Sequence, residues 1–195
     1  MVHIPYLASV YAETLRIRTA DTVMRSTTFA PIQLGKWLIP RGKTIAINLY
    51  NLMNDPEVWN QGGPEDPHPL REFWDERFLA YTDGGGSSNR VTGPPKLPPP
   101  APGPASASAP APVPAEPRFS TDHLRGVYIP YGGGLNECPG RIFAKQSILY
   151  AVAALLRGFD VDLTGAQAPE MDWKMYGIGI LGQKGRVGFR IRRRE

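Results

Sequence analysis

Cysteine, histidine and long apolar runs are scarce in this 195-residue chain. Its single cysteine, Cys138, excludes an intrachain disulfide, so the thiol stays free for other chemistry. Residues 1–5 lack the charged and apolar regions of a signal peptide, and no run approaches the roughly 18 apolar residues of a membrane helix. We therefore expect neither a signal peptide nor a membrane span in the sequence as it stands.

Two further kinds of site have little support. With one cysteine, the three histidines (His3, His68 and His123) offer a zinc site or a Cys–His nucleophile pair, but their spacing matches neither. The glycine run at 132–134 is not followed by the Gly-Lys-Ser/Thr sequence of a phosphate-binding loop, so a phosphate cradle is not predicted.

Acidic residues are slightly outnumbered, 18 against 22 lysines and arginines, which gives a net charge of +4. Much of the excess lies near the end, where no aromatic residues alternate with the arginines as stacking platforms would. We interpret this basic tail as a solvated strand end and expect no nucleic-acid partner. The arginines concerned are Arg190, Arg192, Arg193 and Arg194.

The length and the 42% of hydrophobic residues predict one globular unit. In residues 4–17, apolar side chains recur at helical spacing and Pro5 suits a first turn, which predicts an amphipathic helix. Residues 22–48 are β-branched and alternating, with turn chemistry at 40–43, which predicts a β-hairpin.

A loop region and an insertion follow. Residues 49–59 predict one or two helical turns, and aromatic residues within 73–78 anchor an ordered loop. Residues 83–118 turn to Gly, Ser, Ala and Pro, with 11 prolines between Pro94 and Pro117. Because this stretch has few apolar side chains to bury, we expect a disordered or polyproline-like insertion between parts 1–82 and 119–195.

The last part predicts a helix and a hairpin. Residues 139–157 are apolar nearly all round, which predicts a helix buried in a core and capped by Gly158. Residues 177–181 and 186–191 alternate on either side of a glycine-containing turn, which predicts a terminal β-hairpin.

The strongest pattern surrounds Cys138, which directly precedes a helix that begins with proline. The N-terminus of a helix favours a negative charge, here a thiolate, which can ligate a metal or act as a nucleophile. Glycines at 132–134 and at 140 remove the side chains that would keep a flat partner away. A buried structural cysteine is the alternative for a lone cysteine.

Residues 131–140 read aromatic-Gly-x-Gly-x-x-x-Cys-x-Gly and resemble the cysteine-ligand loop of cytochromes P450. The resemblance implies that the cofactor is haem b and that Cys138 is the proximal ligand of its iron. It also implies contacts to the haem from Tyr131, Gly132, Gly134 and Gly140. The sequence departs from the family in having Tyr131 instead of Phe and Asn136 where a basic residue often pairs with a haem propionate.

A second resemblance is the family's Glu-x-x-Arg helix, which here is Glu13 to Arg16. An ordinary helical ion pair is the alternative interpretation. Arg77 would complete the family's Glu-Arg-Arg triad, whose role is structural support of the cysteine loop. Arg25 resembles a position that often binds a haem propionate, and a solvated strand arginine is nearly as good an interpretation.

The order of these elements implies the C-terminal portion of the cytochrome P450 fold, a mainly α fold with β structure (α+β). Its parts would be the Glu-x-x-Arg helix, a small β-sheet, the meander, the cysteine loop, a buried helix and the terminal hairpin. The resemblance begins late in the family's fold, without the long distal helix that supplies protons, so no catalytic residue is assigned. Substrate would contact residues 20–24 and 176–181.

The resemblance implies a truncated haem- and iron-binding monooxygenase that inserts one oxygen atom from O₂ into a small hydrophobic organic substrate. Its electrons would come from NADPH through an NADPH–cytochrome reductase. Arg141 and Lys145 would assist docking of that reductase, and the equally good alternative is that both side chains are simply solvated. The run after Cys138 and the 176–181 segment loosely resemble the sterol and prostanoid branch. A full-length relative would be anchored in the endoplasmic reticulum membrane. The alternative is a non-catalytic haem-binding or structural fragment whose proline-rich residues 98–102 bind a partner.

Overall fold

The computed structural model describes residues 4–81, 117–165 and 169–194. These residues belong to two compact units, one drawn from 1–14 and 56–125 and the other from 15–55 and 126–195. The predicted insertion lies outside the described residues except for Pro117 and Arg118, which begin a strand.

The first unit is built on the start of helix α1 (Pro5–Arg18). It also contains two short antiparallel ribbons and the 3₁₀ turn η1 (Asp122–Leu124). The ribbons pair β5 (Gly62–Gly63) with β6 (Asp66–Pro67) and β7 (Leu79–Tyr81) with β8 (Pro117–Phe119).

Aromatic packing forms the core of the first unit. Phe78 is fully buried and meets Trp59 edge to face, with ring centroids 5.8 Å apart. The small side chains of Ala8 and Ala12 on α1 are also buried, and the backbone N–H of Phe78 donates to the hydroxyl of Ser9 at 3.3 Å. The helix predicted over residues 4–17 is therefore confirmed, and its small apolar residues lie in the core.

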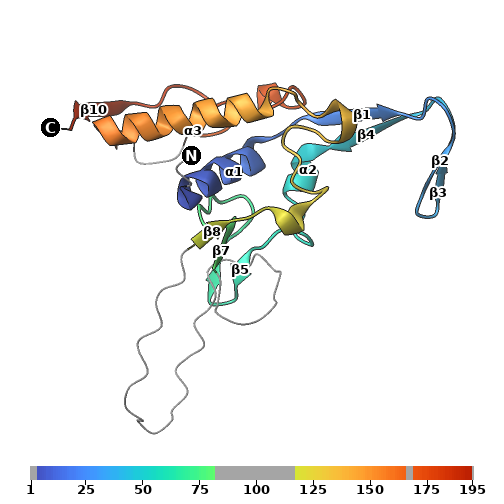
Figure 1. Ribbon diagram of the computed structural model, residues 1–195, viewed down its shortest axis with the longest axis horizontal. Helices are drawn as coiled ribbons and strands as arrows, with labels where there is room; N and C mark the ends of the chain where they lie inside the picture. Colours follow the sequence, from blue (N-terminus) through green and yellow to red (C-terminus); the bar gives the residue numbers. More distant parts are fainter. Residues whose placement is uncertain (1–3, 82–116, 166–168, 195) are drawn as a thin grey trace, which may run out of the picture. The chain divides into compact units, whose positions relative to one another are not determined.

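The second unit contains the end of α1, two long ribbons and helix α3 (Arg141–Gly158) (Figure 1). Strand β1 (Thr22–Ser26) pairs antiparallel with β4 (Thr44–Asn48), as the predicted hairpin requires. A second hairpin, β2 (Ile32–Leu34) with β3 (Trp37–Ile39), lies between them in the chain. The short helix α2 (Leu49–Met53) follows β4, and the 3₁₀ turns η2 (Gly134–Asn136) and η3 (Trp173–Met175) complete the unit.

The predicted terminal hairpin is wrong. Strand β10 (Phe189–Arg193) pairs antiparallel with β9 (Phe159–Leu163) instead of with residues 177–181. The register explains the choice, because Arg190 faces Asp162, Arg192 faces Asp160 and the apolar Ile191 faces Val161. Residues 177–181 instead bond to the backbone at the end of α1 and just after it; the Leu181 N–H, for example, donates to the carbonyl of Arg18, the last residue of α1, at 2.7 Å.

The predicted burial of the second helix is also wrong. Helix α3 begins at Arg141, and none of its residues is buried; Phe143, for example, is 77% exposed. Gly158 is its last helical residue, and Phe159 caps it by donating to the carbonyl of Leu155. An all-apolar pattern predicts a surrounded helix, but the described residues do not surround this one.

The named strands of the described residues all pair in two-stranded antiparallel ribbons, and isolated bridges add single pairings, of which Asp21–Gly177 and Pro130–Gly132 are parallel. Within those same residues, no helix combines the length and the apolar character needed to cross a bilayer.

Candidate functional site

The loop before Cys138 is closed by backbone hydrogen bonds. The Cys138 N–H donates to the carbonyl of Tyr131 at 3.0 Å, and the Gly132 N–H donates to that of Ile129 at 2.9 Å. Gly132 and Gly134 have φ of +77° and +69°, in the left-handed region that side chains disfavour. The glycines of the pattern therefore allow the chain to turn and bring Cys138 back toward Tyr131.

Cys138 itself is exposed and lies three residues before the first residue of α3. Its carbonyl accepts hydrogen bonds from the Arg141 N–H at 3.3 Å and from the Arg141 guanidinium at 3.2 Å. Arg141 also pairs with Glu137 at 3.0 Å. A side chain at Gly140 would begin 4.0 Å from the Cys138 Sγ, so the glycine keeps the surroundings of the sulfur open.

Strand β1 meets the glycine side of this loop. The Arg25 guanidinium donates to the carbonyl of Gly133 at 2.6 Å and to that of Met24 at 2.8 Å. A Cβ at Gly132 would lie 3.8 Å from a methyl group of Val23. Arg25 therefore lies beside the cysteine loop and bonds directly to the loop backbone.

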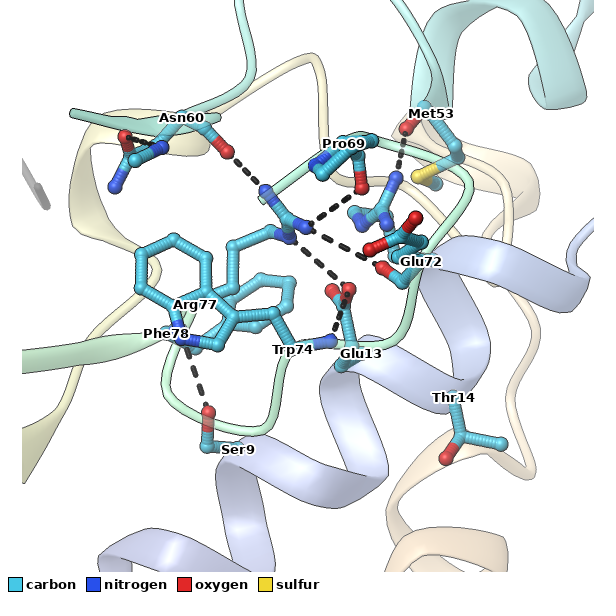
Figure 2. A network of polar contacts seen from close by, with 12 residues as sticks. Ser9, Glu13, Thr14, Met53, Asn60, Pro69, Glu72, Trp74, Arg77 and Phe78 are labelled. Atoms are coloured by element: carbon cyan, nitrogen blue, oxygen red, sulfur yellow. Dashed lines mark hydrogen bonds and ion pairs between the residues drawn. The ribbon is translucent and has the colours of Figure 1, made fainter. Parts of the chain in front are cut away.

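Glu13 and Arg77, two of the predicted supporting residues, form a buried ion pair (Figure 2). The Arg77 Nε lies 3.0 Å from Glu13 Oε1, and the two side chains are 1% and 0% exposed. The same carboxylate oxygen accepts from the Trp74 N–H at 3.2 Å. Arg77 also donates to three backbone carbonyls, those of Asn60, Pro69 and Glu72.

Arg16, the third supporting residue, is also fully buried and belongs to the second unit. It lies one turn after Glu13 on α1, and its guanidinium donates to the carbonyl of Met53 at the end of α2 at 3.0 Å. Helix α1 thus supplies a buried charged residue to both units. Glu13 binds the backbone of the loop at Trp74, and Arg16 binds the backbone at the end of α2.

Sequence reasoning missed the part played by Trp74. Its backbone N–H binds Glu13, the Arg77 guanidinium carbon lies 5.0 Å from its ring centre, and His68 stacks on the ring with centroids 4.0 Å apart. The aromatic residues within 73–78 suggested an anchor, but nothing in their spacing indicated that Trp74 also supplies a hydrogen bond donor.

The two segments predicted to contact substrate lie side by side in the second unit. The Ala20 N–H donates to the carbonyl of Gly179 at 2.8 Å, and the Gly177 N–H donates to that of Ala20 at 2.6 Å. Residues 20–24 and 176–181 are therefore joined by backbone bonds. The described residues contain no cluster of three or more His, Cys, Asp or Glu side chains arranged to hold a metal ion.

Comparison with known proteins places these residues in a family context. A family model described as cytochrome P450 matches residues 1–81. The chain is 37% identical over 191 residues to "Cytochrome P450 monooxygenase efuG" of Hormonema carpetanum, which covers 98% of this chain and 32% of the relative. It is 40% identical over 191 residues to "Cytochrome P450 monooxygenase fsoE" of Humicola fuscoatra, covering 97% and 31% respectively.

Among solved structures, the fold is similar to "Retinoic acid bound cyanobacterial CYP120A1" with a TM-score of 0.58 and 19% identity. The similarity covers 97% of this chain and 32% of that one. The chain thus spans about a third of the length of the proteins that it matches.

Proposed function

Since this chain belongs to the cytochrome P450 family and spans about a third of its curated relatives, we propose that it is the haem-binding part of a monooxygenase, with Cys138 as the iron ligand. The reaction proposed for the whole protein inserts one oxygen atom from O₂ into an organic substrate. Its electrons come from NADPH through a reductase.

The observation that carries this proposal is the position of Cys138. It is the chain's only cysteine, its thiol is exposed, and hydrogen bonds hold it at the end of a turn just before an 18-residue helix. A structural cysteine of the usual kind would be buried among apolar side chains. An exposed sulfur on a closed backbone loop is suited to ligation of a partner outside the chain.

The residues of the loop fit a haem. Cys138 would supply the sulfur ligand of the iron, and the absence of a side chain at Gly132, Gly134 and Gly140 leaves room for close approach to the backbone. When bound, haem with a thiolate ligand favours cleavage of the O–O bond, because the sulfur donates electron density to the iron. Tyr131, whose carbonyl accepts the Cys138 N–H, is the aromatic residue at the start of the loop.

Arg25 has two parts in the proposal. Its guanidinium holds the loop at the Gly133 carbonyl, and the same positive charge beside the loop suits a haem propionate. The guanidinium has five N–H donors, so the bonds to Gly133 and Met24 do not exhaust it. Arg25 therefore orients the loop and offers charge to a carboxylate.

Glu13, Arg16 and Arg77 act as supporting residues in this proposal. The Glu13–Arg77 pair fixes the loop around Trp74 to α1, and Arg16 fixes the end of α2. These contacts are structural, since all three side chains are buried and bonded to protein groups.

The remaining assignments concern partners. We propose that a small hydrophobic substrate, loosely of the sterol or prostanoid kind, contacts residues 20–24 and 176–181. The basic side chains Arg141 and Lys145, on α3 after Cys138, would assist docking of the reductase. A full-length protein of this type would be held at the endoplasmic reticulum.

The carbon monoxide difference spectrum of the reduced, haem-loaded chain tests the assignment. A thiolate-type Soret band is expected from the native chain, and Cys138→Ala should lose it. Cys138→His is the matched control, because an imidazole keeps a ligand at the same position and should retain haem without the thiolate-type band. A thiolate-type band that survives in Cys138→Ala would contradict the proposal.

Turnover separates the monooxygenase from the alternative, a non-catalytic haem-binding or structural fragment. Oxidation of substrate that depends on both NADPH and a reductase would support the first. Haem binding without such turnover would favour the second.

A further inference from the structure

An ion pair joins the two sides of the cysteine. The carboxylate of Glu137, the residue before Cys138, lies 3.0 Å from the Nε of Arg141, the first residue of α3. The Glu137 and Arg141 side chains are 38% and 37% exposed, so the pair lies at the surface, where the thiol of Cys138 is also exposed. We name these two residues the flanking pair.

The flanking pair spans a stretch of backbone that is not helical. Glu137 is extended, with φ of −63° and ψ of 141°, and α3 begins only at Arg141. Because Pro139 has no N–H, the peptide unit between Cys138 and Pro139 can bond only through its carbonyl. Arg141 donates to that carbonyl twice, from its backbone N–H at 3.3 Å and from its guanidinium at 3.2 Å. All of these bonds lie within the chain, so their role does not depend on a reductase.

Arg141 occupies an unfavourable position for a cation. The N-terminus of a helix carries a partial positive charge, so acidic residues are preferred in the first turn. Helix α3 has no acidic residue in its first turn, its N-cap is Gly140, which has no side chain to cap the helix, and its first residue is Arg141. Departures from local preference are typical of functional positions. Glu137 offsets the charge of the arginine, and the loop thereby keeps a cation next to Cys138.

We propose that Glu137 and Arg141 are positioning residues for Cys138, which hold its backbone in place and set the reduction potential of the haem iron through their charges. This inference rests on the proposed function, in which Cys138 is the iron ligand. Hydrogen bonds and charges around a ligating residue orient the ligand and tune the metal. A nearby cation favours the reduced iron, which carries less positive charge, and a nearby anion disfavours it. The two residues therefore act together on the geometry of the loop and oppositely on the reduction potential.

Amide hydrogen exchange in the haem-free full chain tests the effect on geometry. The Cys138 N–H, whose bond to a backbone carbonyl closes the loop, should exchange about two to five times faster in Glu137→Gln and in Arg141→Gln, as expected for loss of an exposed ion pair. The double variant should exchange no faster than Arg141→Gln, because both substitutions remove the same contact. Lys184→Gln, which breaks the exposed pair with Glu170, is the control and should leave this exchange unchanged. Exchange that is unchanged in both flanking variants would overturn the proposal.

The reduction potential of the haem-loaded chain tests the effect of the charges. Arg141→Gln should lower the potential and Glu137→Gln should raise it, and added salt should shrink both shifts because the pair is exposed. A pair that only holds the loop would shift the potential in the same direction in both variants, and that result would contradict the proposal. Unchanged potentials, beside a thiolate-type Soret band that Cys138→Ala removes, would refute the role of the charges and leave the ligand assignment standing. The exchange measurement needs no haem, so it decides the effect on geometry even where the ligand assignment fails.

Discussion

Glu13 and Arg77 show how differently single charges behave in this protein. Both are removed from water and hydrogen-bonded, whereas the Lys184–Glu170 pair has side chains that are 69% and 79% exposed. A buried charge that loses its partner is destabilising, while an exposed pair contributes little. The sequence pattern supplied Glu13 and Arg16 from their spacing, but burial decides their energetic weight, and a sequence pattern does not report burial.

Glu13→Gln should strongly destabilise the first unit. The substitution keeps the shape but removes the negative charge that faces Arg77, which leaves a buried cation and should cost about 3 to 5 kcal/mol. Glu170→Gln makes the same chemical change at the surface and should cost less than about 1 kcal/mol. Urea unfolding of both variants measures the difference. Similar losses of unfolding free energy in the two variants would mean that the buried pair contributes no more to stability than the exposed one.

Asp160 on β9 provides a pH-dependent contact. A hydrogen bond from Arg194, at 2.7 Å, is the main cause that lowers the pKa of the Asp160 carboxyl, and Arg192 adds to it. A lowered pKa in the folded state stabilises the folded state above the unfolded value of about 4, and this stabilisation is lost as the pH falls through the folded pKa. Arg194→Gln should raise the pKa of Asp160 toward its ordinary value in an NMR titration, while Arg193→Gln should leave it nearly unchanged. If the pKa of Asp160 rises equally in both variants, its lowering comes from the net positive charge of the strand and not from the hydrogen bond of Arg194.

At the scale of elements, local patterns predicted α1 and the β1–β4 pairing correctly, but long-range partners were missed. Alternation identifies which residues share a strand face, yet it does not identify the partner strand. Strand β10 pairs with β9, where Asp160 and Asp162 lie opposite its arginines. The cysteine loop was recognisable because all of its pattern lies within ten consecutive residues. The contact of Arg25 with Gly133 spans 108 residues and was not predicted, since the resemblance suggested only a haem propionate as the partner of Arg25.

Gly132→Ala tests the backbone requirement of the cysteine loop. A Cβ there has ordinary room, at 3.8 Å from Val23, so the expected cost of about 1 to 2 kcal/mol comes from the positive φ. Gly133→Ala is the control, because its φ of −157° suits any residue and its Cβ would lie 3.9 Å from Ile129. Gly132→Ala should lower both stability and haem uptake. Equal behaviour of the two variants would show that the left-handed turn is unimportant.

Phe143→Ala tests the exposure of α3 against the burial that the sequence predicted. At 77% exposure, this truncation should change the free energy of unfolding by no more than about 0.5 kcal/mol. The same truncation at Phe78, which is fully buried, should cost about 3 to 5 kcal/mol. Thermal or urea unfolding compares the two. A large loss at Phe143 would restore the prediction of a buried helix.

At the scale of the whole molecule, the comparisons that match Glu13, Arg16 and Arg77 differ from those that match the cysteine loop. The family model matches residues 1–81, which contain Glu13, Arg16, Arg25 and Arg77 but not Cys138. The two fungal relatives align over 191 residues, nearly the whole chain, and yet the alignment covers only about a third of each relative. The role of Cys138 is therefore best tested where the rest of a family member is present.

A chimera provides that setting. Replacing the matching 191-residue segment of the Hormonema carpetanum relative with this chain should give a protein that binds haem and shows a thiolate-type Soret band with carbon monoxide. The band should be absent when the chimera carries Cys138→Ala, and Lys184→Ala, at an exposed residue, should leave it unchanged. A chimera that folds and takes up haem but shows no such band would refute ligation by Cys138, because its surroundings would then be those of a whole family member. If the isolated chain lacks the band and the chimera has it, the loop is competent and the remaining two thirds of the fold are needed to hold the haem.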